Sequence, residues 1–266
     1  MNYLFPQQEQ QNKKTLVIIG NGFDLASGIK SSYNNFKQWL QMNDKYRHLI
    51  SLMDIFFSNQ RDVWGDIEKA LGEYDEDSIV EYCKPDEEID YDHPTRSMAA
   101  VEDSPEWIFR PVLDEFIEAF KDWVDSIDIA KAGKVRELPV ECKYLTFNYT
   151  ETLEVIYGIP ASNILHIHGS RILDNEYIIG HNNFRNPNEA YNDESQMPYL
   201  QETWSKIIEW MNGLVKDSTF IIRQNTDFFS GLSDIEQIVV YGHSFYEVDW
   251  PYMKEIVKQV GSDIPW

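Results

Sequence analysis

Short apolar runs, each followed by a polar motif or a turn, recur along this chain. Thr15–Ile19 (TLVII) is continuous and rich in β-branched residues, which predicts a strand covered on both faces. Lys143–Phe147, Asn163–Ile167 and Gln237–Tyr241 have the same character, and Glu176–Ile179 is a shorter fifth run. Segments with helical spacing separate these runs. Strands that alternate with helices predict an α/β fold with a mostly parallel sheet.

Apolar residues at helical spacing predict helices in five regions, at about residues 34–50, 51–70, 106–127, 196–222 and 250–260. Three of them fall between the first and the second predicted strand. We therefore expect one α/β domain over residues 1–266, with a helical insertion at about residues 35–140. The acidic stretch at residues 73–94 contains two prolines and predicts an exposed excursion.

The net charge of the chain limits the kinds of molecule that it can bind. The chain of 266 residues has 23 basic and 45 acidic residues, a net charge of −22, and such a field repels nucleic acid. The two cysteines, Cys83 and Cys142, predict neither a disulfide framework nor a cysteine-rich zinc site. No secretory signal and no apolar run of about 20 residues is evident, so we expect a cytoplasmic protein that does not enter a membrane.

The turn Gly20-Asn21-Gly22 follows the first predicted strand and opens a helix. Bare backbone at a helix start can approach an anion such as pyrophosphate. The alternative is that glycine only permits a tight bend. Asp24, inside the helix, either complements the helix dipole or meets a ribose or a cationic centre. The turn alone leaves both pairs of alternatives open.

Polar side chains also follow the later strands. Asn148 can position a water molecule against a sugar carbon, or it can form an Asx turn or a helix cap. In HIHG, His166 and His168 share a face if the strand continues, and His168 is a candidate acid/base. His181 and His243 each follow a glycine at a predicted strand exit. Because parallel strands end at one edge of a sheet, we expect a shared crevice there.

In this order, the motifs resemble the AbiH family of bacteriophage abortive-infection proteins and the larger sirtuin-like group of NAD-binding folds. GNGFDLASGIK is similar to the sirtuin pattern GAGxSxxxGI, with Asp24 in place of the serine. TFNYTETLE is similar to TxNYDxxLE, with Thr150 in place of the aspartate. LHIHGS is similar to the strand that carries the catalytic histidine, here His168. VVYGHSFYEVD is similar to a late GxSxxxxD element that ends at Asp249.

The resemblance implies a doubly wound, Rossmann-like and sirtuin-like sheet that binds NAD, and hydrolysis of NAD⁺ to ADP-ribose and nicotinamide. Within it, Asn148 would orient water or ribose, His168 would act as base, and Asp24 would stabilise positive charge. The implied cofactor-binding residues are Gly20, Asn21, Gly22, Phe23, Thr146, Gly169, Gly242 and Ser244. No metal is expected. The zinc cysteines and the PDFR segment of deacetylases are missing, so protein deacetylation is not expected.

Two other functions stay open at this stage. A non-catalytic sensor could bind NAD or ADP-ribose and signal through the helical insertion. A metal-dependent phosphoesterase is a weaker alternative, since its DxH and GDxxD motifs are missing. A toxin of the resembled kind would need gating, so we expect a homo-oligomer or a phage-derived trigger. The segment Trp64–Glu68 (WGDIE) also resembles the AbiH family, and no chemical task is assigned to it.

Overall fold

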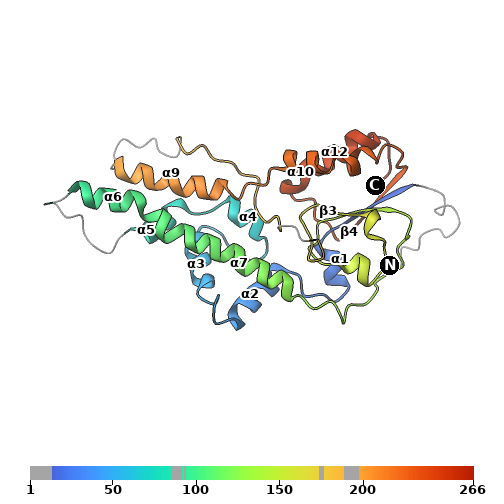
Figure 1. The fold of residues 1–266 in the computed structure, drawn as a ribbon, viewed down its shortest axis with the longest axis horizontal. Helices are drawn as coiled ribbons and strands as arrows, with labels where there is room; N and C mark the ends of the chain where they lie inside the picture. The colour runs from blue at the N-terminus through green and yellow to red at the C-terminus, as the bar shows by residue number, and fades with distance from the viewer. Residues whose placement is uncertain (1–13, 85–91, 93, 174–176, 189–197) are drawn as a thin grey trace. The chain divides into compact units, whose positions relative to one another are not determined.

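The computed structural model describes residues 14–84, 92, 94–173, 177–188 and 198–266, and they form two compact units (Figure 1). Unit 1 combines the part up to Ser31 with Val124–Ile178 and Asp217–Trp266. Unit 2 combines Ser32–Trp123 with Ile179–Lys216. The expected insertion at residues 35–140 therefore overlaps unit 2 without matching it. Its last part lies in unit 1, and unit 2 takes a second segment from further along the chain.

Unit 1 is built on a four-stranded, all-parallel sheet with the order β3-β2-β1-β4. The strands are β1 (Thr15–Ile19), β2 (Lys143–Thr146), β3 (Ile164–His166) and β4 (Gln237–Tyr241). They confirm four of the five predicted runs and the α/β class. In the register, Ile19 stands opposite Thr146 and Tyr241, so three neighbouring strands end at the same level.

The fifth predicted strand is wrong for the residues that the structure describes, 177–179, which are not in a strand. Glu176 lies outside the described residues. The segment is instead held by two single hydrogen bonds. The Ile178 amide donates to the His168 carbonyl at 2.9 Å, and the Ile178 carbonyl accepts the Tyr149 hydroxyl at 3.0 Å. A four-residue apolar pattern does not distinguish such a packed loop from a strand.

Helices cover both faces of this sheet. Side chains of β1 alternate between the two faces, as strand geometry requires. Leu16 and Ile18 belong to the core under α10 (Ser218–Gln224), α11 (Thr226–Ser230) and α12 (Trp250–Val260). Val17 and Ile19 belong to the core with Phe23 of α1 (Asn21–Ala26) and Leu153 of α8 (Thr152–Val155). Figure 1 shows α10 and α12 on one side of the strands and α1 on the other. Two short 3₁₀-helices, η3 (Ala161–Asn163) and η4 (Glu247–Asp249), complete unit 1.

Unit 2 is helical. Its elements are α2 (Tyr33–Met42), α3 (Leu49–Phe56), α4 (Ile67–Gly72), α5 (Glu76–Cys83), α6 (Pro94–Ser104), the π-helix η2 (Pro105–Phe109), most of α7 (Arg110–Ser126) and α9 (Pro198–Asn212). Ser32 starts α2 through a capping box with Asn35, which fixes the first turn. The predicted helix at residues 34–50 is two helices, with a break that begins at Asn43.

The acidic stretch at residues 73–94 is partly helical. Helix α5 buries Ile79, Val80 and Cys83, and Asp75 caps its N-terminus by accepting the Ser78 amide at 3.1 Å. The expectation of an exposed excursion is wrong for this helix, because an apolar set at helical spacing lies among the acidic residues. Residues 85–91 and 93 lie outside the described part of the chain.

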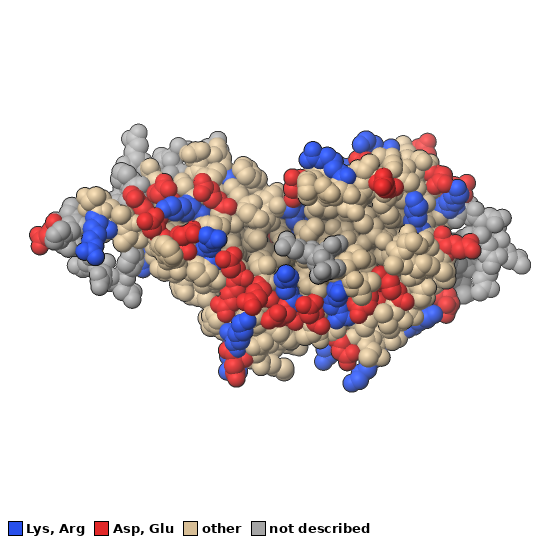
Figure 2. Space-filling view, viewed as in Figure 1, with Lys and Arg blue, Asp and Glu red and all other residues tan. Residues whose placement is uncertain are grey.

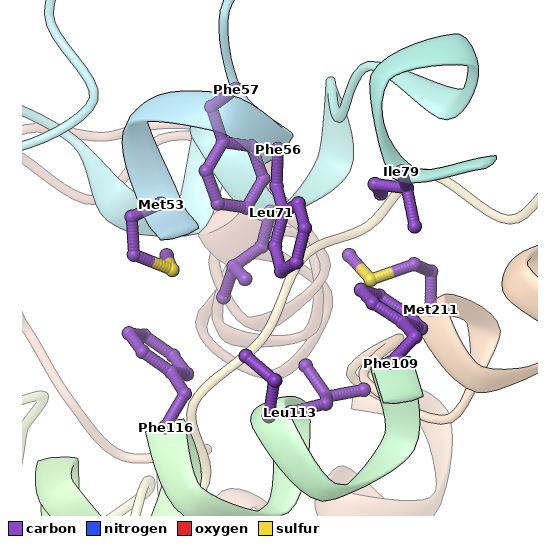
Figure 3. A pocket seen from close by; sticks show the side chains of 10 residues that line it. Met53, Phe56, Phe57, Leu71, Ile79, Phe109, Leu113, Phe116 and Met211 are labelled. Atoms are coloured by element: carbon purple, nitrogen blue, oxygen red, sulfur yellow. The ribbon is translucent and has the colours of Figure 1, made fainter. Parts of the chain in front are cut away.

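The cavity shown in Figure 3 lies in the core of unit 2. Apolar side chains of α3, η2, α7 and α9 surround it, among them Phe56, Phe109 and Met211. It leaves about 10 Å³ of free space for the centre of a water molecule. No polar atom lines this space, so a water molecule would find no hydrogen-bond partner in it. The cavity is a packing defect, and it does not suggest a site for a polar ligand.

Candidate active site

The polar residues that follow the strands of unit 1 gather at the carboxyl edge of the sheet. The strand order reverses between β1 and β4, because the chain adds β2 and β3 on one side of β1 and β4 on the other. In open parallel sheets, ligands bind outside the carboxyl ends at such a reversal. The loops after β1 and β4 therefore flank the position where this fold would bind a ligand.

The glycine turn after β1 packs tightly on the loop after β4. The Gly20 amide donates to the Tyr241 carbonyl and the Gly22 amide to the Gly242 carbonyl, each at 2.9 Å. A Cβ on Gly20 would lie 2.5 Å from the His243 Cα, and one on Gly22 would lie 2.9 Å from the Gly242 Cα. These glycines thus permit the close approach of two loops. Their amides bind the end of β4 and the loop after it, whereas the sequence suggested that they point outward to an anion.

The other two residues of this segment, Asn21 and Phe23, differ in role. The Asn21 side chain is exposed, and its Oδ1 accepts the Ser31 hydroxyl at 2.5 Å. The Phe23 ring is buried against Tyr157, with ring centroids 5.2 Å apart. The Phe23 amide donates to the Gly20 carbonyl. Asn21 therefore presents the exposed side chain of the turn, and Phe23 belongs to the core.

Asp24 is fully buried at the start of α1. The Thr150 hydroxyl donates to Asp24 Oδ2, and Thr150 Oγ1 lies 3.0 Å from Thr152 Oγ1. Burial raises the pKa of the Asp24 carboxyl, while the Thr150 and Thr152 hydroxyls and the Asn148 amide oppose that rise. The second oxygen, Oδ1, makes no hydrogen bond of standard geometry within the described residues. The hydrogen bonds to Asp24 therefore offset only part of the cost of burying its carboxyl group.

Asn148 directly follows the buried Phe147 and is only 6 % exposed. Its backbone amide donates to Thr146 Oγ1 at 3.1 Å, so Thr146 fixes the local turn. Neither Oδ1 nor Nδ2 of Asn148 makes a hydrogen bond of standard geometry within the described residues, although the amide lies near enough to the Asp24 carboxyl to oppose the rise of its pKa. The side chain thus forms neither an Asx turn nor a helix cap, which were the alternatives to a ligand contact. Each unpaired buried polar atom costs about 1–3 kcal/mol, and such atoms are typical of sites that a ligand or water completes.

His166 and His168 do not share a face. Strand β3 ends at His166, so the alternation of side chains does not continue to His168. His166 Nδ1 lies 3.0 Å from the Asn148 carbonyl, and Nε2 lies 2.9 Å from Glu154 Oε1. Both ring nitrogens of His166 are therefore occupied, and this histidine supports the backbone at Asn148.

His168 belongs to a second polar group, on the α12 side of the sheet. Its Nε2 lies 3.8 Å from Asp249 Oδ1, and His243 Nε2 lies 3.2 Å from Asp249 Oδ2. The Phe147 ring contacts both imidazoles, with centroids 5.3 Å from His168 and 4.3 Å from His243. The Tyr252 ring of α12 packs on His168 at 5.7 Å. The consecutive residues Phe147 and Asn148 connect this group to the Asp24 group.

The remaining candidates lie on the backbone around these groups. Gly169 is buried and has φ +87°, and Gly242 is exposed with φ +67°, conformations that favour glycine. Ser244 is exposed in the loop after β4. Ligand binding by any of these residues stays a prediction. Sequence reasoning gave no catalytic task to His243, and the signal that could have done so is the GH pair directly after a strand.

Two motifs noted in the sequence belong to unit 2. Both ring nitrogens of His181 are bonded, since Nε2 lies 3.0 Å from the Met211 carbonyl and Nδ1 accepts the Asn183 amide at 3.2 Å. Burial lowers the pKa of His181. In the WGDIE segment, Glu68 binds the buried ammonium group of Lys216 at 2.6 Å. These contacts are structural.

On the face shown in Figure 2, acidic side chains cover more area than basic ones. Within the described residues, no group of three His, Cys, Asp or Glu side chains is arranged to hold a metal ion. None of the described helices combines the length and the apolar character needed to cross a membrane.

Comparison with protein families identifies a family that this chain matches. Residues 16–266 match the family described as bacteriophage abortive infection AbiH. Comparisons with curated proteins and with solved structures found no match.

Proposed function

Because the chain belongs to the AbiH family, which implies a role in bacteriophage abortive infection, we propose that it hydrolyses NAD⁺ to ADP-ribose and nicotinamide. One observation carries the proposal. Three buried polar atoms, Asp24 Oδ1 and both amide atoms of Asn148, make no hydrogen bond of standard geometry within the described residues. They lie on elements that leave the carboxyl edge of a parallel sheet. A ribose hydroxyl or an attacking water would supply the donors and acceptors that these atoms need.

The strand order supports a dinucleotide as the ligand. The order β3-β2-β1-β4 corresponds to the first four strands of the dinucleotide-binding order 3-2-1-4-5-6. Since the Gly20 and Gly22 amides bind the carbonyls of Tyr241 and Gly242, the pyrophosphate would rest on other groups of these loops. Asn21 and Ser244 present exposed side chains there.

The two departures from the sirtuin-like pattern also support the proposal. The pattern has a serine at position 24 and an aspartate at position 150, and this chain has Asp24 and Thr150. The Thr150 hydroxyl donates to the Asp24 carboxylate, so the two departures are partners. The hydroxyl and the carboxylate have exchanged positions, and the site keeps both groups.

The chemistry requires little acid catalysis. The bond between nicotinamide nitrogen and ribose carbon breaks, its electron pair neutralises the pyridinium, and the sugar passes through an oxocarbenium-like state. Asp24, when ionised, would stabilise that positive charge. Asn148 would orient the attacking water or the ribose. His168 would accept the proton that water releases as its oxygen bonds to the sugar carbon.

Turnover by the purified protein tests the proposal. We expect release of nicotinamide and ADP-ribose in equal amounts from NAD⁺, measured by chromatography. Asn148→Ala and His168→Ala should each lower kcat at least about 100-fold, the scale of a lost general base or positioning group. Asn34→Ala and His48→Ala, at exposed positions of unit 2, are matched controls.

Because gating by oligomerisation or by a phage-derived trigger is expected, the same measurement is made on NAD⁺ in infected cells. Binding of NAD⁺ without turnover in either setting would favour the non-catalytic sensor. Turnover that survives in both site variants would refute the assignment of Asn148 and His168.

A further inference from the structure

We propose that Arg171 is a positioning residue for the loop after β2, residues 147–151. This loop carries Asn148 and Thr150, two groups of the candidate site. Arg171 holds it by binding Glu151 and the end of α7 with one guanidinium group. That the loop binds a ligand rests on the proposed function. The hydrogen bonds of Arg171 lie within unit 1 and can be tested without a ligand.

Arg171 and Glu151 form a largely buried ion pair with two hydrogen bonds. Arg171 Nε donates to Glu151 Oε2 at 2.8 Å, and Nη2 donates to Oε1 at 2.6 Å. The two side chains are only 12 % and 15 % exposed. A guanidinium group matches both oxygens of a carboxylate in this parallel arrangement, so the pair fixes direction as well as distance. The position of Arg171 therefore determines where Glu151 lies.

The third nitrogen of the guanidinium group binds the end of α7. Arg171 Nη1 donates to the carbonyl of Ile127, just past the helix, and the carbonyls of Val124 and Asp125 lie 3.5 and 3.4 Å from it. The last carbonyls of a helix have no acceptor role within the helix, and they attract a cation. Arg171 thus connects Glu151 to the end of a long helix and not to another loop.

The backbone of Arg171 contacts the same loop. Its amide donates to the Tyr149 carbonyl at 3.1 Å. Arg171 follows His168 by three residues, in the segment after β3. The contacts of Arg171 therefore join the segment that carries His168 to the loop that carries Asn148, the two groups to which the proposed reaction assigns the base and the positioning of water or ribose.

Successive residues of the loop have different partners. The Thr150 hydroxyl donates to the Asp24 carboxylate. The neighbours of Thr150 bind the chain after β3 instead, since the Tyr149 hydroxyl donates to the Ile178 carbonyl at 3.0 Å and Glu151 binds Arg171. Groups that contact a ligand need neighbours that fix their position. Tyr149 and Glu151 provide this support, and Arg171 binds both of them.

Amide hydrogen exchange of the full-length protein, measured by mass spectrometry, tests these contacts without a ligand. Arg171→Lys keeps the charge, but a single ammonium group does not replace the three nitrogens of the guanidinium fork. We expect exchange in peptides that cover residues 147–151 to become at least about tenfold faster, the scale of one lost charge-assisted hydrogen bond, with no change in β1. Arg223→Lys, at an exposed position of α10 in the same unit, is the matched control.

Calorimetric titration with ADP-ribose tests whether the position of the loop matters for binding. At a temperature where all variants are folded, Arg171→Lys and Glu151→Gln should each raise the dissociation constant at least about tenfold. The double variant should raise it no more than the more affected single variant does, because both substitutions break the same contact. A merely structural role would lower the melting temperature and leave the dissociation constant of the folded protein unchanged.

The outcomes separate this proposal from the proposed function. If exchange in residues 147–151 is no faster in Arg171→Lys than in Arg223→Lys, or if it rises equally in β1, Arg171 does not position the loop. Binding of ADP-ribose that is equally tight in the unmodified protein and in Arg171→Lys would also overturn the proposal. If exchange changes as expected but the unmodified protein does not bind ADP-ribose, the contacts of Arg171 stand and the proposed function fails. Should Arg171→Lys fail to fold, Glu151→Gln decides, because it keeps the shape of the side chain.

Discussion

Replacing Asp24 by asparagine should stabilise the protein and abolish its activity. Asp24 is fully buried, and one of its oxygens makes no hydrogen bond within the described residues. Asparagine has nearly the same shape, and its oxygen can still accept the Thr150 hydroxyl. The substitution removes a buried charge and places a donor beside Asn148.

The magnitude follows from that unpaired oxygen. Leaving a buried polar atom without a partner costs about 1–3 kcal/mol. For a chain of this size, each kcal/mol moves the melting temperature by about 2–4 °C, so Asp24→Asn should melt roughly 2–12 °C higher near neutral pH. The gain in stability from Asp24→Asn depends on pH. Because burial raises the pKa of Asp24 in the folded state above 3.8, the unfolded chain ionises first as pH rises, and folded stability is lost.

Thermal unfolding at about pH 7.5 and about pH 4 measures this effect, because the penalty on the folded state is small at a pH where the unfolded carboxyl is only about half ionised. We expect the difference between Asp24→Asn and the unmodified protein to be large at the higher pH and small at the lower. Asp263→Asn, at an exposed position of unit 1, controls for the loss of one charge. A variant that is less stable at both pH values would refute the view of Asp24 as an uncompensated buried acid.

Other substitutions test the supporting structure. Gly22→Ala should lower the free energy of unfolding in urea by about 1–3 kcal/mol, because the added Cβ would meet the Gly242 backbone. Gly133→Ala, whose Cβ would enter open space, should leave that free energy unchanged. Equal effects of the two substitutions would contradict the close approach of the loops. Lys216→Met should cost about 3–5 kcal/mol, because it removes the buried ammonium group that binds the largely buried Glu68 carboxylate. The double variant with Glu68→Leu should recover much of this loss. A Lys216→Met variant of ordinary stability would refute the role of the pair. Since burial lowers the pKa of His181, the stability of the folded protein should fall as pH drops below about 6.5. His181→Gln should flatten this part of the stability–pH profile. An unchanged profile in the variant would contradict the view that His181 is buried in its neutral form.

The strands were predictable because their signal is local. Thr15–Ile19 and Gln237–Tyr241 are apolar runs with sharp polar ends, and the structure has strands with the same bounds. Glu176–Ile179 carried a weaker version of this signal, and it packs as a loop. Helix breaks such as that at Asn43 were not predicted, because apolar spacing continues across them. The division into two units depends on contacts between segments far apart in the sequence, which periodicity does not contain.

The candidate site was predictable in its parts and not in its partners. The sequence identified Asn148 and His168 as residues that follow strands. It could not show that Asp24 binds Thr150, 126 positions away, or that Asp249 lies between two histidines. Such pairings depend on side-chain direction after a strand ends. The end of β3 at His166 reversed the expected relation between His166 and His168.

Calorimetric titration with ADP-ribose tests the central claim most directly, because this product keeps the adenine, the pyrophosphate and the ribose and cannot be hydrolysed at the nicotinamide bond. The account predicts saturable heat with the unmodified protein, no heat with Asn148→Ala, and unchanged heat with Asn34→Ala. Equal heat in the unmodified protein and in Asn148→Ala, or none in either, would contradict it.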